Sequence, residues 1–153
     1  MRNAVALVIF LALTYAVAAI GGASSGPDEW YRSLTKPPWT PPSWVFGPAW
    51  GLLYTLMAVG AWLVWRQAGE APIALPLGLY AVQLVLNGLW SVLFFGLHSP
   101  GLAMADIVLL WLAIVATTYA FWQISTVAGI LFLPYLLWVT FASTLNYAIW
   151  RLN

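Results

Sequence analysis

Five long apolar runs dominate this chain of 153 residues, separated by one long and three short stretches that contain polar, Pro or Gly residues. Each run holds roughly 20 residues, which is the length that an α-helix needs to cross a hydrocarbon core of about 30 Å. The breaks fall at Pro, Gly, Ser and charged residues, which commonly end helices. The pattern therefore predicts an all-α bundle of five membrane-spanning helices, at about residues 4–22, 45–65, 75–97, 101–122 and 129–152.

The first and fourth spans carry further signals at their ends. The first span follows Arg2 and contains Ala16-Val17-Ala18, so it also fits a secretory signal that is removed. Its apolar run is long for a signal, which favours a retained helix. Before the fourth span, Ser99 fits a helix N-cap and Pro100 the first helical position, so His98 is interpreted as a solvated turn residue.

Composition supports a membrane protein and excludes several other classes. Only 6% of the residues are charged, against about a quarter in soluble domains. A net charge of +1 provides no basic surface for nucleic acid. Cysteine is absent, which excludes disulfides and thiolate metal sites, and one histidine with four acids disfavours a protein-only metal centre. The short connections predict a single domain over residues 1–153.

The positive charges give a weak indication of orientation. An odd number of spans places the two ends of the chain on opposite sides of the membrane. Arg2 and Arg66 fall on the N-terminal side, whereas Arg32, Lys36 and Arg151 fall on the other side. By the positive-inside rule this distribution favours a cytoplasmic long loop and C-terminus.

The long loop over residues 23–44 is rich in aromatic and proline residues. Its prolines at 37, 38, 41 and 42 predict a stiff, extended segment, which suits a lid or the wall of a pocket. The alternative is an interfacial belt of aromatic residues at headgroup depth. The belt is favoured for Trp44, which lies near a helix start, and both interpretations stay open for Tyr31 and Trp39.

Three helix faces combine aromatic and polar side chains. Residues on one face recur every three or four positions, as do Trp50 and Tyr54 on the second span and Tyr135, Trp138 and Ala142 on the fifth. The third span has the longest such stripe, formed by Tyr80, Gln83, Asn87, Trp90 and Phe94.

Because unpaired amides are costly in hydrocarbon, Gln83 and Asn87 are expected to point inward. They either form interhelical hydrogen bonds or a polar rung in a ligand cavity. The three stripes together favour a cavity, although ordinary packing explains each one singly.

Asp106 is the only carboxylate within a span, which makes it a functional candidate. Its predicted position, within two turns of a helix start, favours a structural role because the helix dipole and nearby water stabilise an anion there.

The last span ends with Leu145, Tyr147 and Arg151 in the loose spacing proposed for sterol contact. The plainer interpretation is that Arg151 reaches the membrane interface beside Trp150. Five tryptophans near span ends, namely Trp44, Trp62, Trp65, Trp122 and Trp150, are sufficiently explained as interfacial anchors.

Several motifs resemble, in order and over nearly the whole chain, the signatures of the TspO/MBR family of tryptophan-rich sensory proteins and translocator proteins. They are Trp30-Tyr31, Lys36-Pro37, Trp39, Pro41-Pro42, Pro48-Ala49-Trp50, Gln83…Asn87…Trp90, Pro134-Tyr135…Trp138 and Leu145-Asn146-Tyr147…Trp150-Arg151.

The resemblance implies a five-helix bundle, usually dimeric, whose first loop caps a pocket for protoporphyrin IX, haem, sterols or isoquinolines, with no cofactor required. It implies that Tyr31, Trp39 and Pro42 line the lid, and that Trp50, Asn87, Trp138 and Ala142 line the cavity. Tyr147 and Arg151 would form the sterol motif. The implied location is a bacterial cell membrane, or the mitochondrial outer membrane in a eukaryote.

Three functions fit this resemblance. The first is binding of porphyrins and related ligands in tetrapyrrole sensing or homeostasis. The second is an enzyme that degrades porphyrin with light and oxygen, for which Trp50 and Trp138 are the candidate catalytic residues. The third is a porphyrin or sterol transporter, which the lack of paired intramembrane charges disfavours.

The dimer interface stays open at this point. Gly47 and Gly51 form a G-x-x-x-G spacing on the second span, with Trp50 between them, and the third span offers only Gly78 and Ala81.

Overall fold

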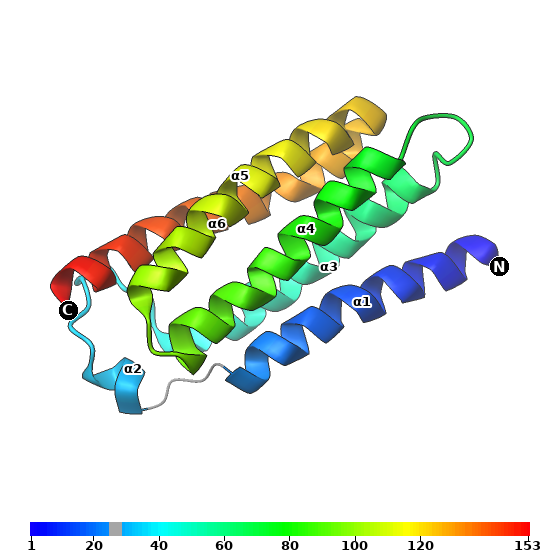
Figure 1. Ribbon diagram of the computed structural model, residues 1–153. Coiled ribbons are helices and arrows are strands. Elements are labelled where there is room, and N and C mark those ends of the chain that lie inside the picture. The colour runs from blue at the N-terminus through cyan, green and yellow to red at the C-terminus, as the bar shows by residue number, and fades with distance from the viewer. Residues whose placement is uncertain (25–28) are drawn as a thin grey trace.

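The computed structural model describes residues 1–24 and 29–153, which form five long helices and three short ones (Figure 1). No strand occurs within these two ranges. The short helices are α2 (Glu29–Ser33), the 3-10 helix η1 (Ser43–Val45) and the π-helix η2 (Val92–Gly96), which continues α4. The long helices are α1 (Arg2–Ser24), α3 (Phe46–Trp65), α4 (Ala74–Ser91), α5 (Pro100–Ile124) and α6 (Thr126–Leu152).

All five long helices are long and apolar enough to cross a membrane. This finding confirms the predicted five-helix membrane bundle, whose boundaries differ by a few residues at most when η2 is counted with α4. The largest difference is the start of α6, which begins at Thr126 rather than near residue 129. The Ser125 hydroxyl caps this helix by accepting a hydrogen bond from the Ala128 amide at 3.3 Å, a signal that the apolar pattern alone did not reveal.

The predicted start of α5 is confirmed. The Ser99 hydroxyl accepts a hydrogen bond from the Leu102 amide at 3.2 Å, and Pro100 occupies the first turn. His98 is exposed and adopts the left-handed backbone conformation, with φ of 52°, which makes the tight turn between η2 and α5. Its ring also stacks on Trp30 of α2, which the sequence did not predict.

The five long helices form a closed ring. α1 packs chiefly against α3 and α4, α4 against α5, α5 against α6, and α6 against α3. The two ends of the chain lie at opposite ends of the bundle, and α2 lies at the C-terminal end (Figure 1). Residues from all five long helices meet in the interior of the ring.

The half of the bundle that holds the N-terminus is filled with aromatic side chains. Phe121 and Phe132 pack edge to face with ring centroids 4.9 Å apart, and Tyr80 lies 6.1 and 6.2 Å from them. All three side chains are buried, and this edge-to-face packing adds to the stability gained from burial itself. The other half of the ring also contains packed aromatic side chains, but it encloses a cavity.

Replacing Gly129 with alanine should destabilise the tight junction between α5 and α6. A Cβ at Gly129 would lie 2.5 Å from Cε3 and 2.9 Å from Cβ of Trp122, and the Trp122 Cβ cannot rotate away. Overpacking of this kind lowers the free energy of unfolding by about 1–3 kcal/mol, so we expect a lower melting temperature by circular dichroism in detergent. Gly78→Ala is the matched control, because a Cβ there meets nothing within 4 Å. Equal melting of the two variants would contradict the close contact.

Candidate ligand-binding cavity

A cavity of about 530 Å³ lies inside the ring at the end that holds α2. Its volume falls within the range of about 300–1,000 Å³ that is usual for small-molecule sites. All five long helices contribute to its wall, and aromatic and aliphatic side chains predominate. None of the described residues that line it is charged. Such a cavity favours a flat, largely apolar ligand.

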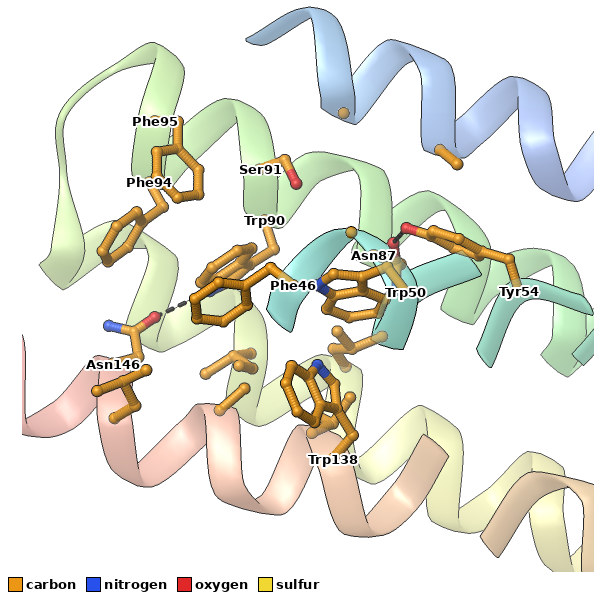
Figure 2. A pocket seen from close by; sticks show the side chains of 18 of the residues that line it. Phe46, Trp50, Tyr54, Asn87, Trp90, Ser91, Phe94, Phe95, Trp138 and Asn146 are labelled. Atoms are coloured by element: carbon orange, nitrogen blue, oxygen red, sulfur yellow. Dashed lines mark hydrogen bonds between the residues drawn. The ribbon is translucent and has the colours of Figure 1, made fainter. Parts of the chain in front are cut away.

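Trp50 of α3 and Trp138 of α6 form the centre of the cavity wall. Their side chains point toward one another from opposing helices, with ring centroids 6.2 Å apart and planes at 84° (Figure 2). Tyr54 stacks on Trp50 at 5.5 Å. The pair therefore presents both a ring face and a ring edge to the cavity, which suits an extended π-system.

The indole nitrogen of Trp138 is buried and has no hydrogen-bond partner among the described residues. A buried donor of this kind is stabilised when a ligand brings an acceptor to it. Trp138 also lines a shallow apolar groove between α3 and α6, so it separates the cavity from the outer surface.

A chain of hydrogen bonds closes the cavity toward the aromatic half of the bundle. The Tyr54 hydroxyl donates to Oδ1 of Asn87 at 2.6 Å, and Nδ2 of Asn87 donates to the Tyr135 hydroxyl at 2.8 Å. That hydroxyl in turn donates to Oε1 of Gln83 at 2.8 Å. We call these four residues the polar floor. Tyr54 and Asn87 line the cavity, whereas Gln83 and Tyr135 are fully buried beside it.

A second polar group lies on the opposite side, near the start of α5. Nε1 of Trp90 donates to Oδ1 of Asn146 at 2.8 Å, and Nδ2 of Asn146 donates to the Pro100 carbonyl at 2.9 Å. Asn146 lines the cavity, although its sequence context did not mark it as a site residue. Its position four residues beyond Ala142, on the same helix face as Trp138, was the signal that could have revealed it.

The lid segment, which comprises residues 29–45, covers the α2 end of the cavity with the side chain of Tyr31. Tyr31 is buried, lines the cavity and packs against Phe95 with ring centroids 5.6 Å apart. Burial raises the pKa of the Tyr31 phenol above its ordinary value. Nζ of Lys36 donates to the Tyr31 carbonyl at 2.7 Å and lies 4.6 Å from the centre of its ring.

The rest of the lid segment is less extended than predicted. Residues 29–33 form the helix α2, and the Thr40 amide donates to the Pro37 carbonyl across a turn. Two hydrogen bonds join Thr35 to Asn153, at 2.9 and 3.0 Å, and thereby fasten the segment to the end of α6. Residues 25–28 of the predicted loop lie outside the described part of the chain.

The structure brings together seven of the ten predicted ligand-binding residues. Tyr31, Trp50, Tyr54, Asn87, Trp90, Trp138 and Ala142 line the cavity, and Gln83, Trp39 and Pro42 do not. Trp39 is 48% exposed and packs against the edge of Phe141 at 5.7 Å, on the outer side of α6. Pro42 is exposed and directly precedes Ser43, which does line the cavity.

The predicted sterol motif is divided between the inner and the outer face of α6. Leu145 is buried and lines the cavity, whereas Tyr147 and Arg151 are exposed. The Tyr147 ring packs instead against Trp150, at 6.2 Å. Leu145 is therefore separated from Tyr147 and Arg151, which lie one turn apart on the outer face of α6.

Asp106 lies within two turns of the start of α5, as predicted, but it is buried rather than near water. Neither carboxylate oxygen has a hydrogen-bond partner among the described residues. It shares the inward face of α5 with Ala103 and Leu110, which explains why the helix start does not expose it. The described residues contain no group of three or more potential metal ligands.

Comparisons with known proteins agree with this architecture. The model of the TspO/MBR family matches residues 6–151. Protein CrtK of Rhodobacter capsulatus is 45% identical over 150 residues, which cover 96% of this chain and 94% of that protein. The human translocator protein is 48% identical over 127 residues, covering 82% and 75% of the two chains. The tryptophan-rich sensory protein of Cereibacter sphaeroides is 44% identical over 147 residues, covering 94% and 91%.

Proposed function

Because this chain belongs to the TspO/MBR family and is a multi-pass integral membrane protein, we propose that it binds porphyrins and other flat hydrophobic ligands, such as sterols, in the cavity between its helices. The role that follows is sensing or homeostasis of tetrapyrroles. The observation that carries the proposal is the uncharged cavity with Trp50 and Trp138 at its centre. A flat π-ligand can stack on one indole while the other contacts its edge.

Titration with protoporphyrin IX tests this proposal. We expect saturable quenching of tryptophan fluorescence in the purified protein, because the ligand would lie in direct contact with two indoles. A linear decrease identical to that of a mixture of free tryptophan and empty micelles would contradict it. Competition by a sterol then shows whether the two ligand classes share the cavity.

A second function is supported by the direct contact of the two indoles. Trp50 and Trp138 both line the cavity and touch one another, so an electron can pass between them and a bound porphyrin. We propose light- and oxygen-dependent porphyrin degradation as the alternative. Under illumination in air, the Soret band of the complex should then decay faster than that of porphyrin in protein-free micelles. Equal decay in both samples argues for binding alone.

A further inference from the structure

Gly47 and Gly51, which in the sequence resemble a helix-dimer motif, lie in the wall of the cavity on the side of α1. A Cβ added at either glycine would meet no atom within 4 Å. Gly47 is also exposed. At these two positions, one turn apart on α3, the wall of the cavity carries no side chain.

The side of α1 that faces the cavity carries one large side chain, that of Tyr15, and otherwise small residues. Tyr15, Ala18 and Gly21 recur every three residues and line the cavity. Tyr15 is 40% exposed, so it reaches both the cavity and the outer surface. Its hydroxyl donates to the Gly51 carbonyl at 2.7 Å and lies 2.5 Å from Oγ1 of Thr55. Tyr15 thus bridges the seam between α1 and α3 beside the cavity.

The other borders of the cavity are held more tightly. Between α1 and α4, a Cβ at Gly21 would lie 3.1 Å from Oγ of Ser91, and one at Gly88 would lie 3.1 Å from Val17. The lid segment is fastened by the stacking of Trp30 on His98 and by the two hydrogen bonds between Thr35 and Asn153.

α1 is also the least enclosed of the five long helices. In the most apolar 18-residue stretch of α1 only 17% of the residues are buried, against 28–39% in the corresponding stretches of the other four long helices. Few packed side chains therefore oppose a small outward movement of α1 at its cavity end.

The α1–α3 seam opens toward the lipid. Gly47 and Gly51 lie within the first two turns of α3, at most about 9 Å along the helix from its start. The seam therefore faces the leaflet that borders the α2 end of the bundle. Because no charged residue lines the described cavity, the carboxylates of a porphyrin are best solvated outside it, at the headgroups nearby.

We propose that ligands enter and leave the cavity sideways from the bilayer, between α1 and α3, and that Tyr15 is the latch of this portal. This inference rests on the proposed function. A ligand dissolved in the leaflet would displace the Tyr15 hydroxyl from Gly51 and Thr55, pass over the two glycines and reach Trp50. The lid segment stays closed throughout.

Crosslinking tests the portal, since the chain has no natural cysteine. A Tyr15→Cys/Thr55→Cys pair can be joined by a short bifunctional methanethiosulfonate and released by reductant. Association and dissociation of protoporphyrin IX would be followed by stopped-flow tryptophan quenching in lipid nanodiscs. We expect both rates to fall by about tenfold or more when the pair is joined, and to recover on reduction.

Two further pairs serve as controls. Asn3→Cys/Trp62→Cys joins the same two helices at the far end of the bundle, where Nε1 of Trp62 donates to the Asn3 carbonyl, and should leave both rates within about twofold. Joining the Thr35→Cys/Asn153→Cys pair locks the lid segment, and it should also leave both rates within about twofold. Slowing by the lid crosslink alone, or by none of the three, would overturn the portal.

Tyr15→Phe provides a test without crosslinking. Loss of the latch should raise the rates of association and dissociation by about three- to eightfold, the factors that correspond to one and two membrane hydrogen bonds of average strength. Tyr119→Phe, an exposed tyrosine on α5, should not change them. Unchanged rates in Tyr15→Phe would overturn the role of the latch. Absence of saturable quenching even in the unmodified protein would instead overturn the proposed function, and the portal with it.

Discussion

Replacing both Trp50 and Trp138 with phenylalanine should weaken protoporphyrin IX binding by roughly 30-fold or more, which corresponds to about 2 kcal/mol, the loss usual for a central aromatic anchor. The two indoles contact one another at the centre of the cavity, and both would lose area against the ligand. The change also removes the buried Nε1 donor of Trp138. The shift of the Soret band on titration measures the affinity without depending on the deleted tryptophans.

Trp44→Phe is the matched control for this variant. Trp44 precedes α3 by two residues but is 75% exposed and does not line the cavity, so its replacement should leave the affinity unchanged. A double variant that binds as tightly as the unmodified protein would contradict the assignment of the cavity. Thermal denaturation of the same samples separates a loss of binding from a loss of folding.

Asn87→Leu should destabilise the bundle even more than the overpacking at Gly129. It removes two hydrogen bonds of the polar floor, to Tyr54 and to Tyr135, and leaves the Tyr54 hydroxyl without an acceptor. Two such bonds in a membrane bundle contribute about 0.6 kcal/mol each, and a stranded buried donor costs about 1–3 kcal/mol. We therefore expect the free energy of unfolding, measured by denaturing-detergent titration, to fall by about 2–4 kcal/mol.

Gln123→Leu makes the same chemical change at an exposed site near the end of α5. Its free energy of unfolding should stay within about 0.5 kcal/mol of the unmodified value. If Asn87→Leu proved as stable as this control, the polar floor would contribute packing only. Ligand titration of Asn87→Leu would then show whether the amide matters for binding rather than for folding.

The repeating pattern of the helices predicted the framework and the aromatic and polar centre of the cavity. The length of the apolar runs predicted the five spans. The recurrence of aromatic and polar residues every three or four positions placed Trp50, Asn87 and Trp138 on helix faces that do meet. These predictions succeeded because a side chain's direction on a regular helix follows from its number in the sequence. Apolar lining residues such as Phe46 and Ile107 carry no signal that distinguishes them from ordinary core.

The docking of the lid segment and the role of Gly47 and Gly51 could not be predicted in the same way. Tyr31 and Trp39 both belong to this aromatic segment, and nothing in the sequence decides which of them enters the bundle, yet Tyr31 is buried over the cavity and Trp39 is exposed beside Phe141. Contacts to residues far along the chain, such as His98 and Asn153, decide how the segment docks. In the same way, a G-x-x-x-G spacing fits a dimer contact or a thin wall equally well until the neighbouring helix is known.

The polar floor has a consequence for how the protein is made. Gln83 and Asn87 belong to α4. The Tyr135 hydroxyl, which bonds to both of them, belongs to α6, the last of the five long helices to be synthesised. When α4 and α5 have been inserted but α6 has not, the two amides therefore face the membrane interior without this partner. Unpaired amides are unfavourable in hydrocarbon. Arrival of α6 satisfies both amides and joins α5 to α3 in one step. A nascent chain arrested before Thr126 should thus remain with the insertion machinery, because its interior is complete only when the final 27-residue helix has entered the bilayer.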